Sequence, residues 1–196
     1  MQESFDPSTI TNLHKTSIIL WKANGIEYQH KQFLQLVEEN HAFNFQLWHA
    51  EDRARRDDMG FEFVYRAKRE IDTYNQQRNN RMEAMDEWLY KALQPENHNH
   101  CPVNSESPGM IIDRLSILSL KSYHMDLQTK RQDVGVEHRM ACTQKLEIIQ
   151  QQLSQLALCL GELLNEVQAK TRTFRVYHQF KMYNDPKLNP ELYCSD

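Results

Sequence analysis

The sequence predicts an all-α protein: a single-domain antiparallel helical bundle of about five principal helices with an extended C-terminal strap. Its 196 residues include only 5 Gly and 6 Pro, and several long stretches contain neither, whereas an all-β domain needs frequent turns. Apolar residues recur at the spacing of an α-helix rather than that of a strand. With 40% hydrophobic and 26% charged residues, residues 1–196 suit one domain with a real core.

The first two helices are predicted from caps and apolar spacing. Asp6 or Ser8 is expected to cap a first helix, because both side chains accept hydrogen bonds from free backbone N–H groups. Gly25 is expected to end this helix, since glycine favours helix C-termini. A second helix is predicted from about residue 28 to residue 56.

The middle of the chain predicts two helices separated by a loop. A third helix is expected over residues 61–93, and Arg78 interrupts its apolar stripe. A polar, proline-flanked loop follows at residues 95–107. The next helix, from Pro108 to about Leu127, has apolar residues on opposite sides. This pattern predicts a central, buried helix.

The last long helix is predicted from about residue 137 to residue 170. Apolar residues spaced alternately by four and three form a heptad stripe over residues 142–167, the pattern of left-handed helix packing. Two explanations stay open: a partner helix within the same chain, or the seam of a homodimer. Residues 171–196 begin with alternating aromatic and polar residues and then turn, which predicts a strap across the bundle.

Charge and composition exclude several classes of protein. A net charge of −4 and a pI near 6.1 give no general attraction to nucleic acid, so nucleic-acid binding is not expected. No apolar run approaches the roughly 20 residues that a membrane crossing needs. The N-terminus lacks the pattern of a signal peptide, and the 4 scattered cysteines suit reduced thiols. We therefore expect a cytoplasmic protein without a membrane span.

Polar side chains interrupt the apolar stripes of the second, third and fourth helices. Burying charged groups is costly unless they are paired, so we expect these interruptions to meet in space. They define a predicted ligand site of His41, His49, Asp52, Lys68, Asp72, Asn75, Arg78, Asp113 and Arg114.

The residue types at this predicted site suit an anionic or sugar-containing metabolite. Arginine presents a planar fork to carboxylate or phosphate, and the first turn of a helix offers free N–H groups to an anion. His49 and Asp52 are candidate catalytic residues, since histidine beside a carboxylate moves protons near neutral pH. The sequence assigns no reaction and leaves open whether the protein is an enzyme.

The same residues have a purely structural alternative, a buried salt-bridge network that fixes the helix register. Under the ligand hypothesis, Arg78→Met removes binding and spares the helical fold. Under the network hypothesis, Arg78→Met unfolds the protein. A cavity lined by His49, Asp52, Arg78 and Asp113 favours a ligand; paired side chains without a cavity exclude it.

No cofactor is predicted, and no functional metal is expected. Glu38-x-x-His41 has the spacing of carboxylate-bridged di-iron bundles, but the second such motif and two further glutamates are missing. His41, His49 and Asp52 remain weak candidates for a mononuclear site.

Five segments of the chain carry a resemblance to a known family. They are Trp48–Arg55, Ile71–Asp72 with Asn75–Asn79, Asn104–Gly109, Ile111–Leu118 and Phe180–Pro186. Together they resemble an uncharacterised bacterial family, domain of unknown function 4254, over residues from about 34 to 193. The resemblance implies a bacterial, cytosolic, all-helical protein of unassigned activity. Residues 108–115 are also similar to helix-opening segments of small bacterial proteins found beside glycosyltransferases, which implies a link to cell-envelope glycan metabolism.

Two functions therefore follow as expectations. The first is binding, with or without turnover, of a small anionic or sugar-containing metabolite in a polar pocket between helices. The alternative is a non-enzymatic interaction or scaffold protein whose buried polar residues form a structural salt-bridge network.

Overall fold

The structure, a computed structural model, describes residues 5–180, 182 and 185–193. Within these residues the chain forms six α-helices, one 3-10 helix and no strand, which confirms the all-α prediction. The elements are α1 (Pro7–Asn24), α2 (Gln32–Arg53), η1 (Asp57–Met59), α3 (Phe61–Leu93), α4 (Pro108–Thr129), α5 (Val136–Gln168) and α6 (Pro190–Tyr193).

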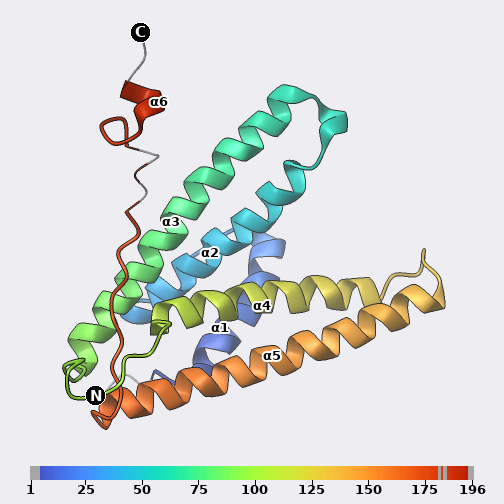
Figure 1. Cartoon of the computed structure of the whole chain (residues 1–196). Helices are drawn as coiled ribbons and strands as arrows, with labels where there is room; N and C mark the ends of the chain where they lie inside the picture. Colours follow the sequence, from blue (N-terminus) through green and yellow to red (C-terminus); the bar gives the residue numbers. More distant parts are fainter. Residues whose placement is uncertain (1–4, 181, 183–184, 194–196) are drawn as a thin grey trace.

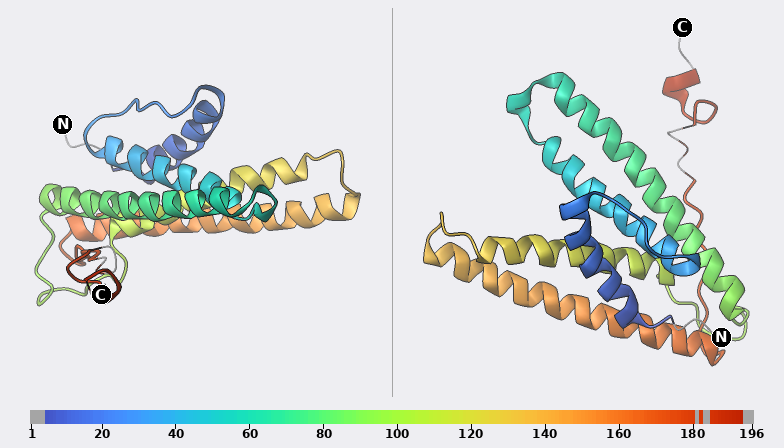
Figure 2. Two further views of the ribbon diagram at one scale, coloured as in Figure 1. Left: turned by 90° about the horizontal axis from the view of Figure 1, so that it is seen from above. Right: turned by 180° about the vertical axis from the view of Figure 1, so that it is seen from behind.

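The five long helices form two antiparallel hairpins and a crossing helix. The α2–α3 hairpin and the α4–α5 hairpin diverge from a shared end, so that the molecule has a V shape (Figure 1). α1 lies across the back of α2 and α4 and reaches α5 (Figure 2). α4 contacts each of the other four long helices, as its apolar residues on opposite sides predict.

The main apolar core joins all five long helices. Ile10 of α1, Val37 of α2, Met85 of α3, Ile112 of α4 and Leu160 of α5 are each at most 1% exposed and belong to one cluster. A smaller cluster joins α1, α2 and α4. Apolar burial is the main favourable term in folding, so these clusters fix the helices that carry the polar residues described below.

The ends of α1 agree with the sequence, whereas α2 is shorter than predicted. The Asp6 side chain accepts a hydrogen bond from Ser8 N at 3.1 Å, and Gly25 follows α1 with φ 85°. α2 begins at Gln32 rather than near residue 28. The buried Glu38 carboxylate accepts hydrogen bonds from the backbone N–H groups of Gln29 and His30, and these bonds hold the preceding segment outside the helix.

The start of α4 is fixed against α3. The Gly109 N–H donates to Asp86 Oδ1 at 2.6 Å, and burial raises the pKa of Asp86 to about 6. A Cβ atom at Gly109 would lie 2.5 Å from the Met82 carbonyl oxygen, which is too close for any side chain. Glycine at this position therefore permits the close crossing that brings the middle of α3 to α4.

The C-terminal half of the α5 heptad stripe lies within the bundle. Leu153, Leu160, Leu163 and Val167 are buried in the main core with residues of α1 and α4. In the N-terminal half, Leu146 and Ile149 are only partly buried. A partner helix within the chain therefore explains the C-terminal half, and a homodimer through α5 stays a prediction.

The C-terminal segment runs beside α3 (Figure 1). Phe174 is 1% exposed and packs edge-to-face on Tyr90 with ring centroids 5.9 Å apart. Farther along, His178 forms an ion pair with Glu83 of α3. Of the predicted strap 171–196, residues 181, 183–184 and 194–196 lie outside the described residues. Among the described helices, none has the length and apolar character that crossing a membrane requires.

Candidate functional site

A buried ion pair between α3 and α4 forms the centre of the candidate site. Arg78 donates from Nε to Asp113 Oδ1 at 2.8 Å and from Nη2 to Asp113 Oδ2 at 2.7 Å. The Asp113 side chain is 2% exposed and that of Arg78 is 26% exposed. Asn40 and Asn44 of α2 also donate to Asp113 Oδ1, at 3.1 and 2.9 Å. The buried carboxylate is thus paired and hydrogen-bonded, as a buried charge must be.

The hydrogen bonds continue from Asp113 to α1. Asn44 donates to Ser116 Oγ at 3.0 Å, Ser116 Oγ lies 2.7 Å from His41 Nδ1, and His41 Nε2 lies 3.0 Å from the His14 carbonyl oxygen. Because a carbonyl only accepts, His41 carries its proton on Nε2 and accepts at Nδ1 from the Ser116 hydroxyl. We call this network the polar spine: His14, Asn40, His41, Asn44, Arg78, Asp113 and Ser116.

Both histidines of the polar spine are neutral. Burial lowers the pKa of His41 to about 3, and burial together with His41 lowers the pKa of His14 well below its ordinary value. Their rings lie 4.6 Å apart, and neither ring nitrogen of His14 has a hydrogen-bond partner in the described part of the chain. Both ring nitrogens of His41 are occupied by hydrogen bonds, so in this arrangement neither faces a metal position.

A cavity of about 350 Å³ opens beside the polar spine, between α2, α3 and α4. Its volume lies at the lower end of the range of small-molecule sites, about 300–1,000 Å³. Its walls consist of Asn44, Leu47, Trp48, Glu51, Asp52, Arg55, Asn75, Arg78, Ile117 and Leu120. The sequence predicts that Asp52 and Asn75 both lie near Arg78, and all three residues line this cavity.

Arg78 belongs to both the polar spine and the cavity. Its Nε and Nη2 atoms bind Asp113, whereas Nη1 has only a 3.5 Å contact with Asn75 Oδ1. Nη1 is therefore the part of the guanidinium that remains available to an acceptor in the cavity.

The rest of the cavity combines apolar and polar groups. Trp48 stacks on His124 with ring centroids 4.3 Å apart and planes 8° from parallel, which fixes the orientation of the indole. Glu51 and Asp52 supply carboxylate oxygens, and Arg55 and Arg78 supply N–H groups. Arg55 Nη1 already pairs with Glu51 Oε2 at 2.7 Å. The charged groups of the lining balance, two of each sign.

His49, a predicted catalytic and ligand-binding residue, lies outside this lining. Its ring packs edge-to-face on Phe45, with ring centroids 4.8 Å apart. The centroid of the His124 ring lies 6.2 Å from that of His49. Burial lowers its pKa, and the charge of Lys22 lowers it further. No hydrogen bond joins His49 to Asp52 in the described part of the chain, although the Asp52 charge acts on the His49 ring and opposes the lowering of its pKa. Their catalytic role stays a prediction.

Lys68, Asp72 and Arg114 do not join the polar spine. Lys68 and Asp72 are exposed on α3, and Asp72 lies 3.7 Å from Arg69 in an exposed ion pair. An α-helix turns about 100° per residue, so the Asp72 and Arg78 side chains point in directions that differ by about a third of a turn around the helix axis. Arg114 follows Asp113 directly and therefore points to another side of α4, where it binds Glu106 at 2.6 Å.

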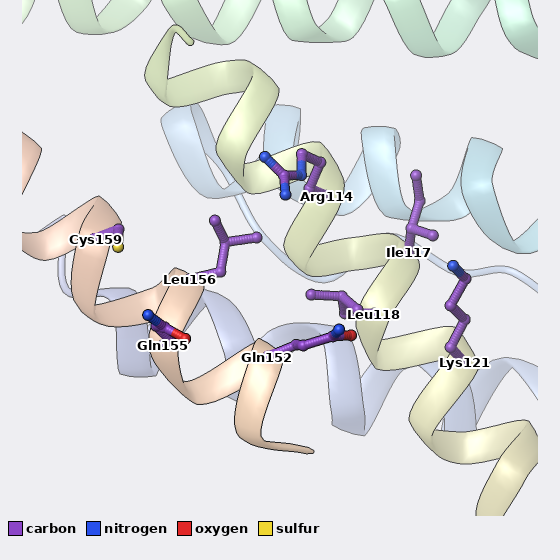
Figure 3. A pocket seen from close by; sticks show the side chains of 8 residues that line it. All are labelled: Arg114, Ile117, Leu118, Lys121, Gln152, Gln155, Leu156 and Cys159. Carbon is purple, nitrogen blue, oxygen red and sulfur yellow. The ribbon is translucent and has the colours of Figure 1, made fainter. Parts of the chain in front are cut away.

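Arg114 instead lines a second cavity, of about 530 Å³, between α4 and α5 (Figure 3). The other lining residues are Ile117, Leu118, Lys121, Gln152, Gln155, Leu156 and Cys159. Ile117 lines both cavities. The Ile117 side chain on α4 is therefore a shared wall of two neighbouring cavities.

Metal-ligating side chains converge elsewhere. Across the described residues, His41, His49 and Asp52 do not bring their ligand atoms together, whereas Glu83, Glu87 and His178 do so within 4.8 Å. These three groups lie near the surface between α3 and the C-terminal segment, where His178 already pairs with Glu83.

Sequence reasoning missed four members of the polar spine, namely His14, Asn40, Asn44 and Ser116. Asn40 and Asn44 are one turn apart on the face of α2 that also carries His41. A polar residue repeated at this spacing on a buried face is a signal for a hydrogen-bond network. Ser116 gave no such signal, because its role depends on how closely α2 and α4 pack.

The fold and site thus define an all-α protein with a buried polar spine and two adjoining cavities. The chain belongs to the family described as "Protein of unknown function (DUF4254)", whose match covers residues 34–176. This range includes α3, α4, α5, all but the first two residues of α2, and all the residues that line the two cavities. No curated protein and no solved structure matches the chain significantly.

Proposed function

We propose that the protein binds a small metabolite with sugar-type hydroxyls and an acidic group in the cavity between α2, α3 and α4. The observation that carries this proposal is the position of Arg78. Asp113 holds one edge of its guanidinium, and Nη1 remains available beside Asn75 in the cavity wall.

The Asp113 contact makes Arg78 a preorganised donor. A surface arginine loses rotational freedom when it binds a ligand, at a cost of about 0.5–1.5 kcal/mol per side chain. The two hydrogen bonds to Asp113 have already fixed Arg78 in the folded protein. A charge-assisted hydrogen bond from Arg78 Nη1 to an acidic ligand therefore carries a smaller entropic cost than the same bond from a surface arginine.

The remaining walls suit the hydroxylated part of such a ligand. The carboxylates of Glu51 and Asp52 accept hydrogen bonds from hydroxyl groups, and the amide of Asn75 both donates and accepts. Trp48 and Ile117 supply apolar surface for the faces of a sugar ring. A link to cell-envelope glycan metabolism, which the resemblance of residues 108–115 implies, belongs to the same proposal.

The proposed role is binding rather than turnover. Of the two candidate catalytic residues, Asp52 lines the cavity and His49 does not. Because they share no hydrogen bond in the described structure, the cavity has no proton-transfer pair made from these two residues.

The alternative is an interaction or scaffold protein, and the full pairing of the Asp113 carboxylate favours it. Asp113 accepts four hydrogen bonds from three residues, as a structural network requires. The arms of the V also expose apolar side chains, including Phe61 at 85% and Leu158 at 69%. Under this alternative the cavity beside Arg78 stays without a ligand.

Equilibrium dialysis distinguishes the two functions. The purified protein is dialysed against a filtered metabolite extract of the organism that makes it, and compounds enriched with the protein are identified by mass spectrometry. We expect an acidic, hydroxylated compound to be enriched. Enrichment of no compound contradicts the proposal and supports the scaffold alternative.

Asp52→Ala and Asp72→Ala form a matched pair for this test. Both remove an exposed aspartate from a helix, but only Asp52 lines the cavity. A hydrogen bond to a charged group contributes about 1.5–3 kcal/mol, so we expect Asp52→Ala to weaken binding about tenfold or more. Asp72→Ala should leave binding unchanged, and equal effects of the two substitutions would place the ligand elsewhere.

A further inference from the structure

The lining of the cavity between α4 and α5 has two cationic side chains and no anionic one. Arg114 and Lys121 both line it, and its other lining residues are uncharged. The two cations are seven residues apart, so they lie on one stripe of α4 with Ile117 between them. Figure 3 shows this stripe of α4 and the facing side chains of α5. The neighbouring cavity, by contrast, has equal numbers of positive and negative groups.

The polar groups of this cavity have donors to spare. Arg114 binds Glu106 through Nη1 alone, which leaves Nε and Nη2 to another acceptor. Across the described residues, Lys121 forms no ion pair, and the side-chain amides of Gln152 and Gln155 form no hydrogen bond. Arginine, lysine and amide N–H groups are the donors that bind phosphate or carboxylate oxygens.

We propose that the α4–α5 cavity binds a second oxyanion group, phosphate or carboxylate, of the ligand whose first acidic group binds Arg78 Nη1. This inference rests on the proposed function and extends it from one cavity to two. The position of Ile117 carries it, because this one side chain borders both cavities and makes them neighbours.

The spacing of the two cations limits the shape of the ligand. Seven residues of α-helix rise about 10 Å, so Arg114 and Lys121 lie along an elongated site rather than around a single point. An extended ligand with two acidic groups satisfies both cavities, whereas a monosaccharide with one acidic group satisfies only the cavity beside Arg78. The proposed substrate class is therefore an acidic sugar derivative, such as a phosphorylated or carboxylated saccharide.

Cys159 provides a reporter for this cavity. It is exposed and belongs to the lining, whereas Cys101 lies in the loop after α3, outside both cavities. Alkylation by iodoacetamide, a neutral reagent, is followed at each cysteine by peptide mass spectrometry. Pyrophosphate and citrate serve as the phosphate and carboxylate probes, with sodium chloride at the same ionic strength as the reference.

We expect pyrophosphate or citrate to slow alkylation of Cys159 at least threefold relative to chloride, with no change at Cys101. Lys121→Gln should abolish the protection. Lys145→Gln, which removes an exposed lysine of α5 outside the cavity, should keep it. Protection by pyrophosphate alone assigns a phosphate, and protection by citrate alone assigns a carboxylate. Absence of protection by both probes, or protection that survives Lys121→Gln, overturns the inference.

These measurements distinguish failure of the oxyanion site from failure of the proposed function. Trp48 lines only the cavity beside Arg78, and Cys159 lines only the α4–α5 cavity. If an enriched metabolite changes Trp48 fluorescence but leaves Cys159 alkylation unchanged, the proposed function stands and the oxyanion site is wrong. If pyrophosphate protects Cys159 but no metabolite is enriched, the cavity beside Arg78 is not a metabolite site.

Discussion

Arg78 and Asp113 meet edge to edge across α3 and α4, with donor–acceptor distances of 2.8 and 2.7 Å. This contact gives Arg78 two roles, because one edge of the guanidinium neutralises a buried carboxylate and Nη1 borders a cavity. Loss of folding and loss of binding are therefore both expected from Arg78→Met. The ligand and network hypotheses are not exclusive at this residue.

Arg78→Met should destabilise the protein by about 3–5 kcal/mol, because it leaves the Asp113 carboxylate buried without a counter-charge. Adding Asp113→Asn should recover part of this loss, since the amide removes the charge and its oxygen still accepts from Asn40 and Asn44. The free energy of unfolding, measured in urea for both single variants and the double variant, gives the coupling. A cost below about 1 kcal/mol for Arg78→Met, or no recovery in the double variant, would contradict the buried ion pair.

Stability should fall in mild acid because His14 and His41 are buried as neutral bases. Their folded-state pKa values lie below the unfolded value of 6.5, so the unfolded chain binds more protons as the pH falls. Stability is therefore lost progressively as the pH falls below 6.5. For His41, with a folded-state pKa of about 3, the linkage at pH 5 amounts to about 2 kcal/mol. Urea unfolding between pH 7.5 and 5 measures the net change, in which Asp86, with its pKa raised to about 6, opposes the two histidines.

His14→Phe isolates one of the two histidines. Neither ring nitrogen of His14 has a hydrogen-bond partner among the described residues, so an apolar ring should be accepted at pH 7.5. On lowering the pH to 5, the variant should lose less stability than the natural protein, since one protonation linkage is removed. Asp86 also titrates in this range, but it affects the stability of both proteins equally, so its effect cancels in the comparison. The same pH dependence in both proteins would show that His14 is not a buried neutral base.

Gly109→Ala should destabilise the crossing of α3 and α4. The new Cβ would lie 2.5 Å from the Met82 carbonyl oxygen, and overpacking of this kind costs about 1–3 kcal/mol. Gly161→Ala is the matched control in α5, because the nearest atom to its Cβ would be 3.4 Å away. Alanine in a helix interior is favoured over glycine by up to about 1 kcal/mol, so this control should be neutral or stabilising. Equal melting temperatures for the two variants would contradict the close crossing.

The regular helices could be predicted because their signals are local. Residues 61–93 show a helical apolar period, and Ser107 and Pro108 mark the start of α4; both helices begin where the sequence indicates. The start of α2 could not be predicted in this way. Glu38 holds the backbone of residues 29 and 30 through contacts that depend on the folded chain.

The candidate site could be predicted only in part, because periodicity locates a residue on its own helix but not its partner. Arg78 interrupts an apolar stripe and Asp113 lies on a buried helix, and the structure brings the two together. Arg114 follows Asp113 in sequence, but the helical turn directs it to the α4–α5 cavity. The contribution of Ser116 depends on the distance between α2 and α4, which no local pattern contains.

The most direct test of the central claim is a crystal structure of the protein with the compound enriched by dialysis. We expect an acidic oxygen of this compound about 3 Å from Arg78 Nη1, with its hydroxylated part beside Trp48. The Arg78–Asp113 contact should be unchanged. Enrichment of no compound, or a compound bound away from Nη1 while Arg78 still pairs with Asp113, would contradict a ligand site at Arg78.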